Sequence, residues 1–406
     1  MIMRFTSGIS DAVNASDAAE IAARQVLEQL GNLSCDLACV FASPIYRTEW
    51  PDLLSAVHRR LHPKALIGCS GSGIIGGTQE LEWVPAISIV GAHLPEVRLY
   101  PFVVAQDELE AASPGGFWVD KIGVSPEAHP VFIVAADPYT CDPRRLVAEL
   151  SATYRNAPIV GGLVSGGNEP GQHLAFMGTD VYREGAVGVA MAGNITMDTV
   201  ISQGCRPIGR PWIITKAEDN VLWELAGRQA LAVLHEVLSG LSADDRELAQ
   251  QGSIFIGLAF NEMRQAFGSG DFLIRNIVGI DPSQGAIAVS DQIQVGQTLQ
   301  FQLRDPSTSR QELRRLLQQV YQLPHAQPPA GCLVFNCTGR GKSLYGTAHH
   351  DIRTIQMVSG KLPVGGFFCN GEIGPISGIN LLHGYTASLA LFRPLELPTP
   401  PASGIL

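Results

Sequence analysis

The sequence predicts an α/β protein of two domains, in which mixed sheets with flanking helices are built from repeated strand–helix–strand–strand units. Three observations support this prediction. The 406 residues are enough for two or three domains that each bury a core. Short, continuous apolar runs are typical of central strands buried on both faces. The order of strand, helix, strand and strand recurs three times, which predicts a mixed sheet with helices on a face.

Composition and charge exclude several classes of protein. Hydrophobic residues make up 46% and charged residues 16%, as in ordinary globular proteins. The net charge of −10, without a compensating Lys/Arg cluster, argues against a nucleic-acid partner. No run approaches the roughly 18–20 apolar residues of a membrane span, and the N-terminal segment lacks the basic start and apolar core of a secretory signal. We therefore expect a cytoplasmic protein that has no membrane partner.

The cysteines agree with that compartment. No two of them form a CxxC pair, and several lie within apolar, strand-like runs. Free, buried thiols of a reducing compartment explain them better than a disulfide framework. The prediction of free thiols covers all eight: Cys35, Cys39, Cys69, Cys141, Cys205, Cys332, Cys337 and Cys369.

An amphipathic helix is predicted from Ser16 to Leu30, where Gly31 stops the apolar periodicity. The first copy of the repeat follows, with its parts at residues 36–42 (strand), 51–61 (helix), 65–73 (strand and glycine loop) and 86–90 (strand). The second copy has the corresponding parts at 131–136, 143–154, 158–167 and 186–191. The third has them at 332–336, 351–358, 363–371 and 386–392.

Each copy contains a strand that runs into a Gly-x4-Gly segment. These segments run from Gly68 to Gly73, from Gly162 to Gly167 and from Gly366 to Gly371. We expect the three to occupy equivalent places at strand ends. Proteins of the βαβ type commonly place glycine after strands, so chance matches are the alternative.

A domain boundary is predicted near residues 200–211, because two prolines and two glycines there interrupt regular structure. A helix is expected over 221–238, followed by strands at 254–260, 271–278, 286–289 and 298–304 and by a helix over 311–323. The predicted organisation is an N-terminal helix (1–32), a first domain (33–218), a second domain (219–395) and a loose tail (396–406).

The familiar enzyme and cofactor motifs do not occur. None of the glycine segments is followed by the Lys-Ser/Thr of a phosphate-binding loop, and no Gly-x-Gly-x-x-Gly opens the first helix. The sequence also lacks a Gly-x-Ser-x-Gly nucleophile elbow. His349 and His350 are adjacent, so their rings point apart and chelate poorly. We expect no cofactor and no metal.

One polar constellation remains, in the third copy. Cys337, Gly339, Arg340 and Gly341 leave one strand of the unit, and Asn370, Gly371 and Glu372 leave another. Strands that flank one helix lie close together in a βαβ unit, so these loops should share an edge of the sheet. Arg340 could then bind the carboxylate of a zwitterion while Glu372 accepts from its ammonium group. Alternatively, Arg340 and Glu372 pair only with each other.

Two further possibilities concern Arg206 and the cysteines Cys337 and Cys369. Arg206, within Gln203-Gly-Cys-Arg-Pro-Ile-Gly209, could line a ligand site or be a solvated linker residue. Cys337 or Cys369 could act as an enzymatic nucleophile, although a thiol in an apolar strand is usually a packing residue.

With these motifs in view, the chain resembles the FIST family of bacterial sensory proteins, which is related to the C-terminal part of certain F-box proteins. The first half carries Leu66-Ile-Gly-Cys-Ser-Gly-Ser-Gly73, Pro158-Ile-Val-Gly-Gly162 and the segment 203–209. The second half carries Arg275-Asn-Ile-Val-Gly-Ile-Asp281, Asn336-Cys-Thr-Gly-Arg-Gly341, Gly366-Phe-Phe-Cys-Asn-Gly-Glu-Ile-Gly374 and His383-Gly-Tyr-Thr386. The similarity covers about residues 33–395 and implies a FIST N-terminal and a FIST C-terminal domain.

The resemblance implies a sensing module for signal transduction that binds a small polar metabolite such as an amino acid, with no established catalytic activity. The predicted ligand-binding residues are Arg340, Glu372, Asn370, Cys337, Gly339, Gly341, Gly371 and Arg206. Because no output domain is recognisable, we expect any signal to pass to a separate signalling protein. The alternatives are an enzyme that uses Cys337 or Cys369 and a protein–protein interaction module, which would expose a large apolar patch.

Overall fold

The structure is a computed structural model that describes residues 2–112, 116–264, 266–268, 270–323 and 327–395. It divides into two compact units. The larger unit comprises Met1–Ile201, Leu316–Leu382 and Ala387–Leu406, and the smaller comprises Ser202–Arg315 and His383–Thr386. We call them the repeat unit and the barrel unit. The predicted fold class is confirmed, since the chain is mixed α/β and its mixed sheets are built from the predicted repeat. Within the described ranges, no helix combines the length and the apolar character needed to cross a bilayer.

The first repeat opens the chain with a strand, β1, that the sequence reading missed. Its elements are β1 (Arg4–Ser10), α1 (Ala15–Leu30), β2 (Leu37–Ala42), α2 (Trp50–Leu61), β3 (Ala65–Ser70), β4 (Gly73–Gly76), β5 (Gln79–Glu82) and β6 (Ile87–His93). The predicted helix at 16–30 is confirmed as α1, which Asn14 caps by accepting from the backbone N–H of Asp17. Gly8 lets α1 approach β1, because a Cβ there would lie 2.1 Å from the carbonyl oxygen of Ala22.

The other two repeats follow the same order. The second contains β7 (Val97–Val104), α3 (Gln106–Ala111), α4 (Gly116–Ile122), β8 (Val131–Ala136), α5 (Pro143–Thr153), β9 (Ile159–Leu163), β10 (Ala175–Met177), β11 (Asp180–Tyr182) and β12 (Ala186–Gly193). The third contains β13 (Thr196–Ser202), α8 (Pro306–Tyr321), β22 (Gly331–Cys337), α9 (Lys342–Tyr345), α10 (His350–Ser359), β23 (Val364–Cys369), β24 (Glu372–Ile376), β25 (Ile379–His383) and β26 (Ala387–Arg393). The segment from β14 (Cys205–Pro207) to β21 (Thr298–Arg304), which makes up most of the barrel unit, is therefore inserted between β13 and α8 of the third repeat.

Each repeat forms the core of one six-stranded sheet and receives a hairpin from another repeat. The sheet orders are β1-β6-β2-β3-β10-β11, β7-β12-β8-β9-β24-β25 and β13-β26-β22-β23-β4-β5. In all three, a parallel pair lies at the centre (β2 with β3, β8 with β9, β22 with β23). The hairpins pass in a cycle: β4–β5 joins the third sheet, β10–β11 the first and β24–β25 the second.

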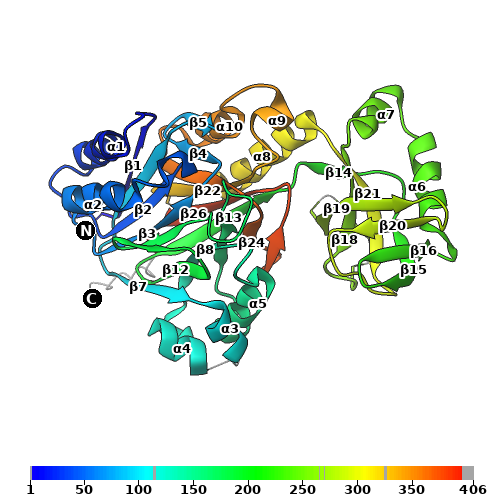
Figure 1. The fold of residues 1–406 in the computed structure, drawn as a ribbon, viewed down its shortest axis with the longest axis horizontal. Coiled ribbons are helices and arrows are strands. Elements are labelled where there is room, and N and C mark those ends of the chain that lie inside the picture. The colour runs from blue at the N-terminus through cyan, green and yellow to red at the C-terminus, as the bar shows by residue number, and fades with distance from the viewer. Residues whose placement is uncertain (1, 113–115, 265, 269, 324–326, 396–406) are drawn as a thin grey trace, which may run out of the picture. The chain divides into compact units, whose positions relative to one another are not determined.

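The three sheets share one hydrophobic core, and helices cover their outer faces. Phe41 of the first repeat stacks on Phe367 of the third with ring centroids 5.3 Å apart, and Val160 and Val189 of the second repeat join the same cluster. Helices α1 and α2 pack on the first sheet, and α3, α4 and α5 pack on the second (Figure 1). The strands are thus buried on both faces, as their continuous apolar runs predict.

Close strand approach explains one glycine in each repeat. A Cβ on Gly68, Gly161 or Gly366 would lie 1.7, 1.9 or 1.8 Å from the carbonyl oxygen of a valine in the parallel neighbour. The register is the same in all three, since these glycines pair with Val40, Val134 and Val334. The repeat is confirmed, with one correction: the equivalent of Gly68 and Gly366 is Gly161, so the second Gly-x4-Gly segment runs from Gly161 to Gly166.

Neighbouring strands of the barrel unit pair in antiparallel fashion. Strand β21 (Thr298–Arg304) pairs with both β15 (Trp212–Glu218) and β18 (Ile254–Ala259), which closes the ring β21-β15-β16-β20-β19-β18. Its remaining elements are β14 (Cys205–Pro207), β16 (Val221–Leu225), β17 (Arg228–Gln229), α6 (Ala230–Ser239), α7 (Ala243–Gln250), β19 (Phe272–Asp281) and β20 (Ala286–Val289). Closure removes the unpaired edges that an open sheet would expose.

The predicted helix over 221–238 is partly wrong. Residues 221–229 form β16 and β17, and the helix α6 begins at Ala230. Leu222 and Leu225 fit helical spacing, but both are buried as strand residues against the barrel core. The tail at 396–406, predicted to be loose, lies outside the described residues.

Candidate functional site

The loops that follow β3, β9 and β23 meet one another, and we call residues 70–73, 163–166 and 368–371 the glycine hub. Ser70 Oγ donates to the carbonyl oxygen of Ser165 at 3.1 Å, and the backbone N–H of Ser72 donates to Ser165 Oγ at 2.9 Å. Asn370 donates from its backbone N–H to Leu163 O and from Nδ2 to Val164 O. Because the three repeats bond to one another here, the hub ties their strand ends together.

The residues predicted to bind a ligand lie beside this hub, apart from Arg206. In the parallel ladder Cys337 is paired with Cys369, so the loops after β22 and β23 leave the same edge of the third sheet. Gly339, Arg340 and Gly341 follow β22, and Asn370 and Gly371 follow β23. Glu372 begins β24, where it pairs with Gly162 of the second repeat. The shared edge is as expected, while the ligand-binding role of these residues stays a prediction.

Arg340 is completely buried and forms a two-point ion pair with Asp351 of α10. Its Nε donates to Asp351 Oδ2 at 2.7 Å and its Nη2 to Asp351 Oδ1 at 3.1 Å. Nη2 also donates to the hydroxyl of Tyr345 at 2.7 Å, and the Tyr345 ring stacks on His350. A ligand carboxylate could reach this guanidinium only by displacing Asp351. Sequence reasoning missed Asp351, whose position inside a predicted helix gave no sign of this pairing.

Two buried carboxyl groups of this network have pKa values that are shifted in opposite directions. Burial by itself would raise the pKa of Asp351, but the charge of Arg340 and the hydrogen bond with His350 hold it well below its usual range. Glu80, on the exchanged strand β5, accepts from the backbone N–H of Ile352 at 2.7 Å. Burial, reinforced by repulsion from Asp351, raises the pKa of Glu80 to about 8. Arg340 and Asp351 of the third repeat thus form a buried ionisable cluster together with Glu80 of the first repeat.

The two candidate nucleophiles, Cys337 and Cys369, lie in this neighbourhood, which does not activate Cys369. Cys369 is fully buried, and burial together with Glu372, Cys69 and Cys337 raises the pKa of its thiol well above the ordinary value. Cys337 accepts a hydrogen bond from the backbone N–H of Gly339. All eight cysteines are buried and free. No group of three or more His, Cys, Asp or Glu that could hold a metal occurs in the described part of the chain.

Arg206 belongs to the barrel unit, whereas the other predicted site residues belong to the repeat unit. It binds Asp245 of α7 and donates from Nε to Asp305 Oδ2 at 3.3 Å. These two ion pairs tie Arg206 to the barrel unit, and its ligand-binding role stays a prediction.

Comparison with known proteins identifies the family. The FIST N domain matches residues 36–228 and the FIST C domain matches residues 230–375. The chain belongs to the FIST family. FIST domains are generally associated with sensing in signal transduction. The predicted resemblance is therefore confirmed, and the two matches together cover nearly the whole chain.

Relatives of this FIST protein occur in mycobacteria. It is 38% identical over 391 residues to the uncharacterized protein Rv0628c of Mycobacterium tuberculosis, covering 96% of this chain and 100% of that protein. It is 38% identical over 393 residues to the uncharacterized protein Mb0898c of Mycobacterium bovis, covering 96% and 99%. A solved structure of a cyanuric acid hydrolase, described as an evolutionary innovation by structural concatenation, covers 97% of this chain and 100% of its own with a TM-score of 0.34 and 8% identity. That structural similarity is too low to carry an inference.

The FIST repeat unit also contains a pocket of about 730 Å³ at the opposite end of the parallel strands from the hub. We call it the Arg155 pocket. It lies where β8 and β9 begin, and loops from the second and third repeats enclose it. Its lining is formed by residues 126, 128–131, 154–158, 193, 195–197, 199, 375, 377, 378, 380 and 395.

The lining of the Arg155 pocket contains cationic and neutral polar groups but no Asp or Glu. Arg155 is exposed and forms no ion pair or hydrogen bond with any residue in the described ranges, and exposed His129 is the other basic group. Asn156, His129 and Ser377 all have positive φ angles, of 65°, 46° and 51°. Such conformations are uncommon for residues other than glycine and often occur at ligand sites.

The first repeat shows why the pocket is not acidic. By strand register, Asp36 of the first repeat corresponds to Pro130 of the second. Asp36 accepts from the backbone N–H of Leu94 and forms an ion pair with Lys64 at 2.8 Å. Pro130 has no charge for such contacts. Sequence reasoning missed this pocket because four distant segments build it, although a proline before each of β8 and β9 marked the edge.

Proposed function

We propose that the protein is a small-ligand sensor that binds a polar metabolite carrying a carboxylate, such as an amino acid, in the Arg155 pocket. The observation that carries this proposal is a preformed volume of about 730 Å³, lined by a cation without a protein partner in the described ranges and by no carboxylate. Volumes of this size suit small molecules. An exposed guanidinium is suited to bidentate binding of a carboxylate.

The rest of the lining suits a small molecule with both polar and apolar parts. Thr196, Thr199 and Ser377 offer hydroxyl groups, while Ile195 and Met197 offer apolar contact. Asn380 is already occupied, since its side chain bonds to the backbone of Ile159 and Ala157. It therefore supports the wall of the pocket.

The third repeat supplies the second candidate site for the same function, at Arg340, Asn370 and Glu372. There, ligand binding would have to exchange Asp351 for the ligand carboxylate. The Arg155 pocket requires no such exchange, and so it is the better supported site.

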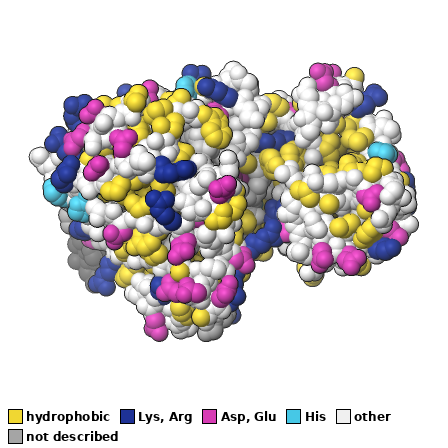
Figure 2. All heavy atoms as spheres, in the orientation of Figure 1, with side chains coloured by type: hydrophobic (Ala, Val, Ile, Leu, Met, Phe, Trp, Pro, Cys, Tyr) yellow, Lys and Arg dark blue, Asp and Glu magenta, His cyan; other side chains and the backbone are white. Residues whose placement is uncertain are grey.

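Two alternative functions, an enzyme and a protein interaction module, make different structural demands. An enzyme that uses Cys369 would need a thiolate, which the raised pKa of this thiol disfavours. A protein interaction module would present a large apolar patch, whereas the face in Figure 2 shows basic, acidic and apolar side chains interspersed. We expect the protein to act in a reducing compartment, the cytoplasm, and to pass its signal to a separate signalling protein.

A thermal-shift screen of amino acids and small carboxylic acids tests the proposal, because a ligand that binds only the folded state raises the apparent stability. The full chain is compared with Arg155→Met and with Arg98→Met, which removes an exposed charge from β7 outside the pocket. We expect a compound that stabilises wild type and Arg98→Met equally and needs roughly tenfold higher concentration with Arg155→Met. The proposal fails if no compound acts, or if Arg155→Met responds like wild type.

A further inference from the structure

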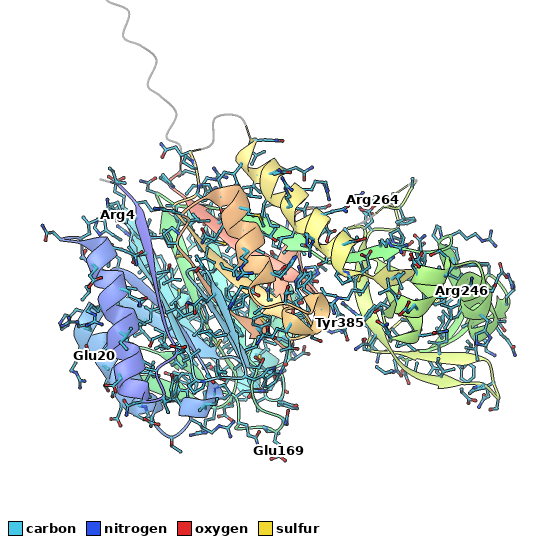
Figure 3. All side chains as sticks on the ribbon, turned by 90° about the horizontal axis from the view of Figure 1, so that it is seen from above. Arg4, Glu20, Glu169, Arg246, Arg264 and Tyr385 are labelled. Atoms are coloured by element: carbon cyan, nitrogen blue, oxygen red, sulfur yellow. The ribbon has the colours of Figure 1, made fainter. Side chains whose placement is uncertain are left out.

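Arg304 of the barrel unit is a buried cation that forms no ion pair with any residue that the structure describes. Its exposed fraction is 7%, and among the described residues neither Nε nor Nη2 has a hydrogen-bond partner. Its guanidinium lies over the ring of Tyr385, whose centroid is 4.9 Å from Cζ (Tyr385 is labelled in Figure 3). A ring face attracts a guanidinium but gives its N–H groups no acceptor.

Neighbouring arginines of the same unit differ from Arg304 in this respect. Arg206 has Asp245 and Asp305, Arg275 has Asp291, and Arg264 has Asp271. The adjacent carboxylate of Asp305 is already occupied, since it also accepts from Ser307 and Thr308. Buried charges are normally paired, so an arginine left alone inside such a set calls for a partner from outside the chain.

Arg304 also lies where separate signature segments of the sequence meet. In the ladder between β14 and β21, Arg304 lies directly opposite Cys205, which belongs to the segment 203–209. Tyr385 comes from the segment His383–Thr386, has a φ of 63° and packs on Phe255 with ring centroids 4.4 Å apart. Phe272 and Ile274 of β19 complete the apolar cluster around Cys205 and Phe255. The chain therefore builds an apolar wall beside the guanidinium.

We propose that Arg304 anchors an oxyanion-binding site in the barrel unit, for a ligand that offers two oxygens to the Nε and Nη2 edge once the side chains that cover these two buried atoms move aside. That edge is the one with which arginine grips carboxylates and phosphates in two-point contacts. The Tyr385 ring fixes the guanidinium plane and so orients the edge. The apolar wall of Cys205 and Phe255 lowers the local dielectric, which strengthens the contact between the charges. The site is independent of the Arg155 pocket, which belongs to the other unit.

The test uses the full chain and compares sodium acetate, sodium phosphate and sodium chloride at equal ionic strength and pH 7. Thermal unfolding and titration calorimetry are measured for wild type, Arg304→Met, Arg304→Lys, Arg155→Met and Arg246→Met. Arg246, on α7 and labelled in Figure 3, is the matched control, because its removal takes the same charge from an exposed position of the same unit. Arg304→Lys keeps the positive charge but lacks the paired Nε and Nη2 donors, and it replaces Arg304→Met in the test if that variant does not fold.

We expect acetate or phosphate to stabilise wild type, Arg246→Met and Arg155→Met beyond chloride, with apparent affinity reduced roughly tenfold or more in both Arg304 variants. Stabilisation by acetate alone assigns a carboxylate ligand, and stabilisation by phosphate alone assigns a phosphate ligand. The proposal is overturned if neither oxyanion acts beyond chloride, or if the Arg304 variants respond like Arg246→Met. An effect lost in Arg155→Met but kept in the Arg304 variants would also overturn it, since it would belong to the Arg155 pocket.

Discussion

Arg340 donates two hydrogen bonds to Asp351, of 2.7 and 3.1 Å, and the exposed fractions of the two side chains are 0% and 1%. Removing the charge of Asp351 should leave Arg340 as an uncompensated buried cation. We expect Asp351→Asn to lower the free energy of unfolding by about 3–5 kcal/mol. Urea unfolding measures the loss, with Asp180→Asn, an exposed carboxylate on β11, as the control. A loss below about 1 kcal/mol would show that the pair contributes little.

Glu372 tests whether the third repeat binds the ligand. A ligand-binding carboxylate that is open in the free protein would tolerate Glu372→Gln within about 1 kcal/mol and lose affinity instead. Because Glu372 is fully buried, we expect the structural outcome, in which Glu372→Gln changes the free energy of unfolding measured with urea by more than about 1 kcal/mol and leaves ligand affinity unchanged. Unchanged stability with affinity reduced tenfold or more would instead support the predicted ligand site.

Glu80 should make stability depend on pH with an unusual sign for a carboxyl group. Its pKa is raised from 4.5 to about 8 in the folded protein, so the folded state retains a proton that the unfolded chain releases. This contribution to stability is complete below pH 4.5 and is lost as the pH rises to about 8. Glu80→Gln should therefore flatten the pH profile of unfolding over this range. The exposed Glu28→Gln serves as control, and an unchanged profile in Glu80→Gln would contradict the prediction.

The glycines at the parallel pairs should tolerate no side chain. Gly68→Ala, Gly161→Ala and Gly366→Ala each place a Cβ within 2 Å of a carbonyl oxygen, and the strands must separate to admit it. We expect each to lower the free energy of unfolding by about 3 kcal/mol or more. Gly116→Ala, where a Cβ meets no atom of the described residues within 4 Å, should be neutral or stabilising in the same measurement. Similar values for Gly161→Ala and Gly116→Ala would refute the equivalence of the three repeats.

Thiol counting checks the state of the cysteines. All eight are buried and free, so titration after denaturation without reductant should find eight thiols per chain, and titration of the folded protein should be slow. Six thiols or fewer would contradict the expectation of a reducing compartment.

The repeats could be predicted because each strand and helix has a strong local pattern. The run at 131–136 matches β8 residue for residue, and Pro143 begins α5 as predicted. The hairpins β4–β5, β10–β11 and β24–β25 could not be predicted, because they are short and pair with strands of other repeats. Val221–Leu225 was misread because two buried leucines three residues apart fit both a helix and a bent strand.

The site was less predictable than the fold. Parallel pairing of β22 and β23 follows from the order of elements, so the common edge of Cys337 and Asn370 could be anticipated. The partner of Arg340 could not, because Asp351 reaches it only through the course of the chain between β22 and α10. The Arg155 pocket and the lone guanidinium of Arg304 depend on segments that only the tertiary structure brings together.

The exchange of hairpins has a consequence for synthesis on the ribosome. Strand β4 emerges early, yet its partner is β23. Ile75 therefore cannot pair with Gly366 until the second repeat and most of the barrel unit have been made. The first sheet lacks β10–β11 until the second repeat is made, and the hairpin β4–β5 has an unpaired edge open to other nascent chains until β23 is made. Such late, long-range closure favours slow folding that finishes only with the last strands. A polypeptide truncated before β23 should therefore be a client of chaperones, because no repeat can complete its own sheet.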